Sequence, residues 1–381
     1  MRQFITGVFL LLITVGCVDR IYFDIPNAYQ YGISISGHIT TTPGPHRVNI
    51  FRTFDTESKD SLKSGVTARS VVISDAEGNS VALTQVKSGI YETAPNAITG
   101  KVGGIYKVTV ELIDGPIYES TPDTLQPGGV VDTAYYIYEG RQVPDGYIHE
   151  YSIKANSSTG ASTPNTYFMW SNKMTYKSVT RPELELKAPC YLQEDNHVRC
   201  NFVAPCSGLR NVGTNAFPDI ERVGPCTCCT CWYNQFSQVI TLSDKFGSSG
   251  GRFVDIPIDR IELTGWNMMF KMRIEVSMQS LSLKAYLFWK AVRDQRNAVT
   301  NIFQPVTGKI PGNIIRIKGP EDRPAIGIFY ATATHQKVFY IERGDTPVPD
   351  IPTTDFKGAG WFPCERLAPN ASNVMPDFWI E

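Results

Sequence analysis

Four cysteines lie close together in the segment Cys226-Thr-Cys228-Cys229-Thr-Cys231. The segment contains two CxxC spacings, Cys226 with Cys229 and Cys228 with Cys231, and thiolates at this spacing can bind zinc or copper(I). A structural zinc site normally draws on a second pair of ligands at similar spacing, whereas the neighbouring cysteines and His197 are irregularly placed. We therefore predict no metal site. A metal site formed by these four thiols is the alternative.

Disulfides are the favoured interpretation of the cysteines. Eight cysteines follow Cys17, and an even number in an exported chain suggests disulfide bonds. Adjacent Cys228 and Cys229 cannot easily bond to each other, so each is expected to pair elsewhere, with Cys200 and Cys206 as suggested partners. The spacing leaves the pairing open, and the candidates are Cys190, Cys200, Cys206, Cys226, Cys228, Cys229, Cys231 and Cys364.

Sequence signatures of catalysis are missing. The chain contains no HExxH, no phosphate-binding GxxxxGK and no GxGxxG after a predicted strand. His149-Glu150 lacks the second histidine of a zinc motif. We interpret the charged turn Pro320–Pro324 as a solvated loop rather than as a catalytic carboxylate pair. We predict no catalytic residue, no cofactor and no enzymatic activity. A hydrolase whose residues are spread over loops is the less favoured alternative.

The composition describes a globular chain with a balanced charge. Hydrophobic residues make up 42% of the sequence and charged residues 19%, which is enough apolar surface for a sizeable core. The formal net charge of −1 gives no electrostatic reason to expect nucleic acid as a partner.

The N-terminus, Met1 to Cys17, is typical of an export signal. Arg2 precedes an apolar run, Val8–Val15, that is much shorter than the ~20 residues of a membrane-spanning helix. The segment Thr14-Val15-Gly16-Cys17 resembles a bacterial lipobox, in which the cysteine receives a lipid. We predict a signal peptide over 1–16, lipidation of Cys17 and a tether over 17–29. An ordinary signal peptide with a chance cysteine is the alternative.

Alternation of apolar and polar residues predicts a mostly β fold. Ile33 and Ile35 alternate with Ser34 and Ser36, and similar patterns recur every eight to twelve residues or so, separated by turn clusters. This spacing is typical of an antiparallel sandwich. We predict an N-terminal immunoglobulin-like β-sandwich over 30–130, ending at the Pro/Gly-rich segment Thr121–Val130.

A larger β-rich domain is predicted over 131–381. It carries a cysteine-rich insertion over 189–231 and one main helix over 281–296, capped by Ser280 or Ser282. We interpret this helix as a structural element packed across a sheet rather than as an aromatic shelf for a ligand. The segments 325–330 and 338–341 are predicted to form a final hairpin.

Taken together, the chain resembles DUF4249, a family of Bacteroidota lipoproteins with a domain of unknown function. Besides the lipobox, the matching features are Ile33–Gly37, Gly89–Tyr91, Gly104–Tyr106, Ile117–Ser120, Cys231-Trp232, Leu281-Ser282, Ala285-Tyr286, Trp289, Asn301–Phe303 with Pro305, Gly312–Ile314, Ala325–Tyr330 and Pro376–Trp379.

The resemblance implies an outer-membrane location, with the lipid as anchor and the cell surface as the expected face. It also implies association with a SusC-like TonB-dependent receptor, for which such a lipoprotein would bind or gate a substrate without transforming it. A structural role in adhesion or envelope assembly is the alternative.

Overall fold

The computed structural model describes residues 32–53, 65–144, 146–159, 166–180, 190–192, 198–200, 205–213, 219–245, 250–299, 310–321, 323–345, 364 and 371–380. Within these ranges the chain is mostly β, as predicted, with one α-helix, α3 (Leu283–Val299). No helix in the described part of the chain is long and apolar enough to cross a membrane. Cys17 and the predicted signal peptide and tether lie outside the described residues.

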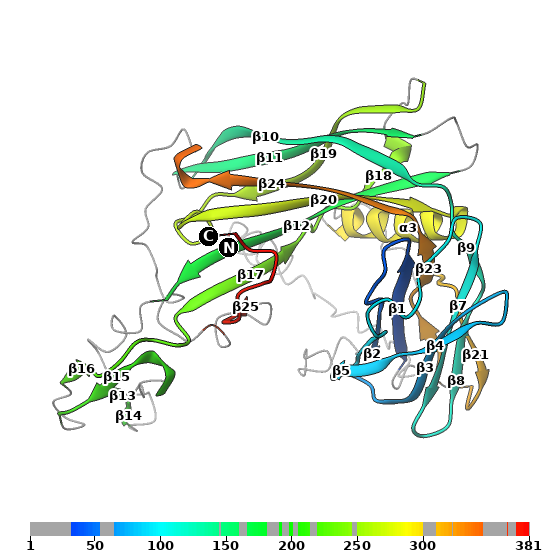
Figure 1. Ribbon diagram of the computed structural model, residues 1–381, viewed down its shortest axis with the longest axis horizontal. Coiled ribbons are helices and arrows are strands. Elements are labelled where there is room, and N and C mark those ends of the chain that lie inside the picture. The colour runs from blue at the N-terminus through cyan, green and yellow to red at the C-terminus, as the bar shows by residue number, and fades with distance from the viewer. Residues whose placement is uncertain are drawn as a thin grey trace, which may run out of the picture.

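Two six-stranded sheets face each other at one end of the molecule and form the unit that we call the sandwich (Figure 1). Sheet A consists of β1 (Ile33–Thr40), β2 (Arg47–Arg52), β5 (Thr84–Lys87), β6 (Ile90–Glu92), β22 (Ala325–Ile326) and β23 (Phe329–Thr332). Sheet B consists of β3 (Ala68–Asp75), β4 (Ser80–Ala82), β7 (Ile105–Leu112), β8 (Ile117–Ser120), β9 (Asp123–Thr124) and β21 (Ile314–Lys318).

The core of the sandwich follows from the alternation of side chains along each strand. Ile35 and Ile50 from sheet A and Ile73 and Val110 from sheet B are fully buried in one cluster. Because side chains point to opposite faces at every second residue, the polar residues between these positions lie on the outer face of each sheet.

Sheets C and D form a second, larger unit (Figure 1). Sheet C consists of β10 (Gly129–Val143), β11 (Gly146–Thr159) and β19 (Arg252–Glu262). Sheet D consists of β12 (Tyr167–Val179), β17 (Thr230–Phe236), β18 (Thr241–Leu242), β20 (Lys271–Leu281), β24 (Thr334–Glu342) and β25 (Ala371–Ser372). Trp170, Met174 and Ile274 of sheet D pack against Tyr151 and Ile256 of sheet C in a continuous core.

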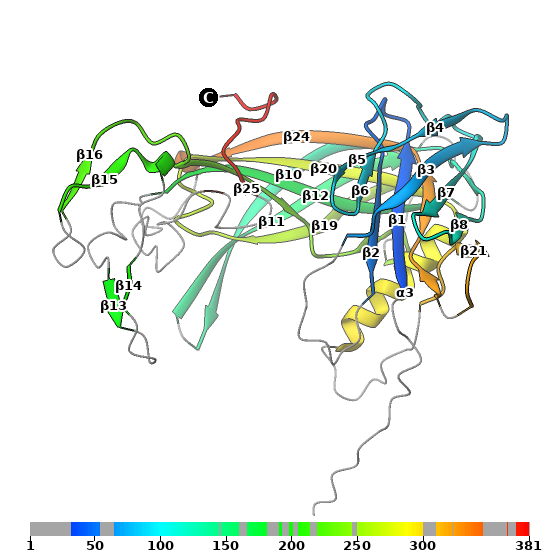
Figure 2. The ribbon, with the colours of Figure 1, turned by 90° about the horizontal axis from the view of Figure 1, so that it is seen from below.

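The predicted cysteine-rich insertion contains two small hairpins. They are β13 (Cys190–Leu192) with β14 (Val198–Cys200), and β15 (Leu209–Asn211) with β16 (Ile220–Arg222). A 3-10 turn, η2 (Pro205–Ser207), lies between the two hairpins in the sequence. Two more such turns are η3 (Ser243–Lys245) and η4 (Arg343–Asp345). Figure 2 shows the hairpins at the end of sheet D that lies farthest from the sandwich.

The final hairpin predicted over 325–330 and 338–341 is wrong. β22 and β23 pair in parallel with β1 of the sandwich, whereas β24 pairs with β20 in sheet D. The reason is a crossing at Ala333, whose N–H and carbonyl both bond to Ser280, so the chain changes sheets within one residue.

The crossing at Ala333 also changes the domain organisation. The segment 30–130 supplies most of the sandwich, but β21, β22 and β23 complete it from residues that the sequence assigned to the second domain. The predicted helix begins two residues later than expected, at Leu283, and Ser282 caps it by accepting a hydrogen bond from the N–H of Ala285 at 3.2 Å.

Candidate functional site

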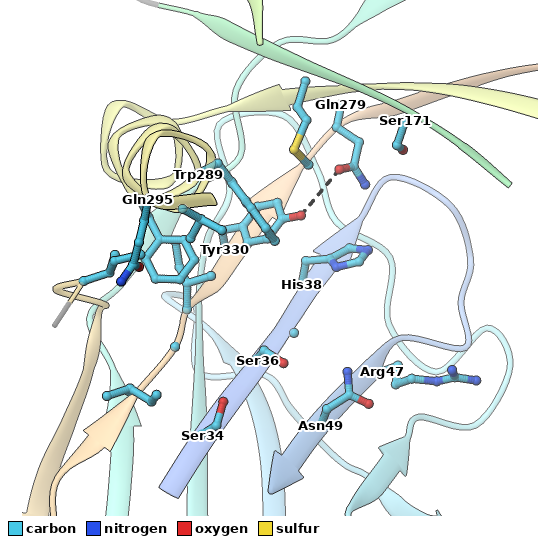
Figure 3. A pocket seen from close by; sticks show the side chains of 18 residues that line it. Ser34, Ser36, His38, Arg47, Asn49, Ser171, Gln279, Trp289, Gln295 and Tyr330 are labelled. Atoms are coloured by element: carbon cyan, nitrogen blue, oxygen red, sulfur yellow. Dashed lines mark hydrogen bonds between the residues drawn. The ribbon is translucent and has the colours of Figure 1, made fainter. Parts of the chain in front are cut away.

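A cavity of about 940 Å³ lies where the outer face of sheet A, the outer face of sheet D and helix α3 meet (Figure 3). This volume is near the upper end of the range of small-molecule sites, about 300–1,000 Å³. The cavity therefore sits at the junction of the two units, a place where ligand sites commonly occur.

The part of the cavity wall that β1 and β2 form is polar. Ser34, Ser36 and His38 occupy alternate positions of β1, so they share its outer face while Ile33, Ile35 and Ile39 point into the core. On β2, Asn49 lies directly opposite Ser36 in the antiparallel register. The four polar side chains therefore line one continuous surface.

An aromatic and aliphatic surface borders this polar row, formed by α3 and by β22 and β23, which lie next to β1 in sheet A. Phe288 and Trp289 from α3 lie edge to face, with their ring centroids 5.6 Å apart. Tyr330 of β23 lies edge to face with Trp289 at 6.3 Å and stacks against His38 at 5.3 Å. Ile326, Ile328 and Val292 complete this surface.

The ends of two strands of sheet D close the cavity on a third side. Met169 and Ser171 alternate on the outer face of β12, and Gln279 lies on the neighbouring β20. The hydroxyl of Tyr330 donates a hydrogen bond to Oε1 of Gln279 at 3.4 Å, which links the sandwich to sheet D across the cavity (Figure 3).

The cavity is close to electrically neutral. Burial, followed by the nearby His46, lowers the pKa of His38 to about 4, so its imidazole is uncharged at neutral pH. Burial likewise raises the pKa of Tyr330, which keeps its hydroxyl protonated. Arg47 is the one charged residue among the described lining residues, and its Nε donates to Oε1 of Glu92 at 2.8 Å.

Helix α3 is held in place by its buried arginine. Arg293, with its side chain 7% exposed, makes two hydrogen bonds of 2.7 and 2.8 Å to the carboxylate of Asp244 in η3. This bidentate pair ties the last turns of α3 to the end of β18. Since α3 carries Phe288 and Trp289, the pair positions the aromatic wall of the cavity.

Replacing Arg293 by methionine is expected to lower the free energy of unfolding by about 2 kcal/mol, because Asp244 loses its partner in a mostly buried site. The guanidinium holds the pKa of Asp244 below its usual value, so the pair stabilises the fold above pH ~4 and less as the pH falls below it. Urea denaturation at pH 7 and at pH 3 measures both effects, and the difference between the wild type and Arg293→Met should shrink at pH 3.

Lys290→Met is the matched control for this prediction. Lys290 pairs with Asp294 on the same helix at 2.9 Å, but both side chains are largely exposed to solvent, which screens the pair, so we expect a much smaller loss than for Arg293→Met. Equal losses in the two variants would contradict the positioning role of Arg293.

None of the predicted cysteines that the structure describes lines this cavity. Three disulfides join Cys206 to Cys228, Cys226 to Cys229 and Cys231 to Cys364. Each cysteine of the alternative metal set is thus bonded to another cysteine, and the described residues contain no cluster of potential ligands. Cys190 and Cys200 lie opposite each other in the hairpin β13–β14.

Sequence reasoning missed the cavity, although it had considered its helix. Leu283 and Leu287 of this helix are 51% and 52% exposed. Ala285 and Tyr286 are the buried residues, so Phe288 and Trp289 lie at the rim of the packed face and reach the cavity. The sequence signal available for the cavity was the row of small polar residues at alternate positions of β1. Such a row predicts only that this face of the strand points away from the core.

Comparison with known proteins identifies a family but no function. The family described as "Domain of unknown function (DUF4249)" matches residues 18–338, which is most of the chain. No curated protein matches the sequence. Because the match covers far more than half of the chain, the protein is a member of the DUF4249 family.

Proposed function

We propose that this protein is a non-enzymatic binding protein that holds a ligand in the cavity between the sandwich, sheet D and α3. The observation that carries the proposal is the cavity itself, with a polar wall on β1 and β2 next to an aromatic wall on α3. Its described lining residues include neither an aspartate nor a glutamate and thus no carboxylate pair of the kind that glycoside hydrolysis needs.

We further propose that the protein is lipid-anchored at Cys17 in the outer membrane, at the cell surface, and acts as an accessory subunit of a SusC-like TonB-dependent receptor. The lipobox-like segment before Cys17 and the membership in DUF4249 support this proposal. On this view the receptor transports what the cavity holds.

We also propose that the sandwich is immunoglobulin-like. The strand orders β1-β2-β6-β5 and β4-β3-β7-β8 correspond to the orders ABED and C′CFG of that fold. In addition, the hydroxyl of Tyr106, near the start of β7, accepts a hydrogen bond from the N–H of Lys101 at 2.9 Å, which is the arrangement of a tyrosine corner. β21 and β22 are then edge additions to the two sheets.

Affinity purification of the tagged full-length protein after gentle detergent extraction tests the receptor proposal. We expect a large TonB-dependent barrel protein to be recovered with it and to be identified by mass spectrometry. The Cys17→Ala variant, which cannot take the lipid, is the control and is expected to leave the membrane fraction. Recovery of the wild type from membranes without any barrel protein would contradict the proposal.

A further inference from the structure

Five polar side chains that line the cavity have no hydrogen-bond partner in the described part of the protein. The side chains of Ser34, Ser36, His38, Asn49 and Ser171 make no hydrogen bond with any residue in the described ranges. None of these five groups is among the described side chains with fully buried, unpaired polar atoms, so they are open to the cavity and to water. A bound molecule that carries polar groups can take the place of that water.

The distribution of these groups limits the shape of that molecule. Ser34 and Ser36 are two residues apart on one strand, roughly 7 Å, and Asn49 is the cross-strand partner of Ser36. Ser171 extends the set to sheet D. The hydrogen-bonding groups are thus spread along the wall rather than gathered at one end, so the ligand must carry its own polar groups along an edge.

The charge of the cavity limits the ligand further. An anionic ligand would need an unpaired cation, but Arg47 is paired with Glu92 and His38 is neutral. A cationic ligand would need a carboxylate, and the described lining residues include none. A wholly apolar ligand would leave the polar row unpaired, at a cost for each group.

An uncharged carbohydrate meets all of these conditions. A sugar ring has an apolar face that packs well on an aromatic surface such as Phe288 and Trp289. Its hydroxyls lie around the edge, where serine hydroxyls and an asparagine amide both donate and accept. The volume of about 940 Å³ suits a short oligosaccharide better than one ring.

We propose that the cavity binds a short, uncharged oligosaccharide, with its rings on Phe288 and Trp289 and its hydroxyls on Ser34, Ser36 and Asn49 (Figure 3). The inference rests on the proposed binding function and names the ligand class of the same site.

Isothermal titration calorimetry of the full-length protein tests this assignment. The uncharged probes are maltotriose, cellotriose, xylotriose and N-acetylchitotriose; trigalacturonate is the acidic probe and decanoate the apolar one. We expect saturable binding of at least one uncharged trisaccharide, accompanied by a change in tryptophan fluorescence. The double variant Ser34→Ala/Ser36→Ala is expected to bind it about tenfold or more weakly, because two hydrogen bonds are lost.

The matched control makes the same chemical change on the other sheet. Ser70→Ala/Ser80→Ala alters exposed serines of β3 and β4, and it should bind the trisaccharide as the wild type does. Equal weakening in both double variants, or saturable binding of only trigalacturonate or decanoate, would overturn the assignment. Absence of binding by all four uncharged probes would overturn it as well.

The two proposals fail separately. If a TonB-dependent receptor is recovered by affinity purification but no uncharged probe binds, the carbohydrate assignment fails and the accessory function stands. If a trisaccharide binds but no receptor is recovered, the accessory function fails and the binding site stands.

Discussion

Replacing Cys231 and Cys364 together by alanine is expected to lower the free energy of unfolding by about 4–5 kcal/mol. The bond closes a loop of 133 residues, and the loss of chain entropy that a disulfide imposes on the unfolded state grows with loop length. Both cysteines are fully buried in the core of sheets C and D. Alanine is apolar, so the substitutions place no polar group in this core. Guanidinium denaturation followed by tryptophan fluorescence measures the change.

Cys226→Ala/Cys229→Ala provides the comparison, because it removes the same kind of bond from a loop with a sequence separation of 3. The same relation between loop length and entropy gives a loss of about 2 kcal/mol for this short loop. The ordering of the two variants is thus the test: a larger loss on removing the short bond than the long one would contradict the account. Wild-type protein under reducing conditions should lose more stability than either variant, because reduction also breaks the Cys206–Cys228 bond.

The strands of the sandwich core were predictable because one face of each is buried. β1 and β7 alternate apolar and polar residues, and the burial along them alternates in the same way. Such a pattern specifies both the element and its orientation, since a shift by one residue would expose every apolar side chain. The helix was predictable for a similar reason, and its observed bounds differ from the expected ones by two or three residues at each end.

The contacts between the two units were not predictable from local patterns. The segments 325–330 and 338–341 read as one hairpin because both are apolar and close in the sequence, yet β22 and β23 pair with β1 whereas β24 pairs with β20. What sends them apart is Ser280, which bonds the backbone of Ala333 on both sides. A single serine at the end of β20 gives no sequence signal of that role.

The candidate site was hidden for the same reason. Ser36, Ser171 and Gln279 come from three strands that are distant in sequence, and each has the ordinary appearance of an outward-facing strand residue. Only the packing of the sandwich against sheet D and α3 brings them to one cavity. The cysteines, whose spacing first suggested chemistry, stabilise the chain instead and lie away from the cavity.

Gly327→Ala is expected to disrupt the sandwich, with a loss above about 4 kcal/mol that shows as insoluble or unfolded protein. Gly327 lies between β22 and β23 with φ of 106°, a conformation that L side chains rarely adopt. A Cβ atom there would lie far inside the van der Waals distance of the carbonyl oxygen of Ile35, in the backbone of β1. This carbonyl is part of the backbone of β1, which is paired with β22 and β23. It therefore cannot move away without breaking that pairing.

Gly78→Ala separates the two causes. Gly78 has φ of 93° in the turn between β3 and β4, but a Cβ atom there meets nothing within 4 Å, so the conformational cost alone, about 1 kcal/mol, is expected. Thermal unfolding of both variants measures the difference. Similar losses would mean that β1 yields to the extra methyl group, and in that case the cavity wall formed by Ser34 and Ser36 would not be rigid. A much larger loss at Gly327 would show that the parallel pairing of β22 and β23 with β1 holds this wall of the cavity in place.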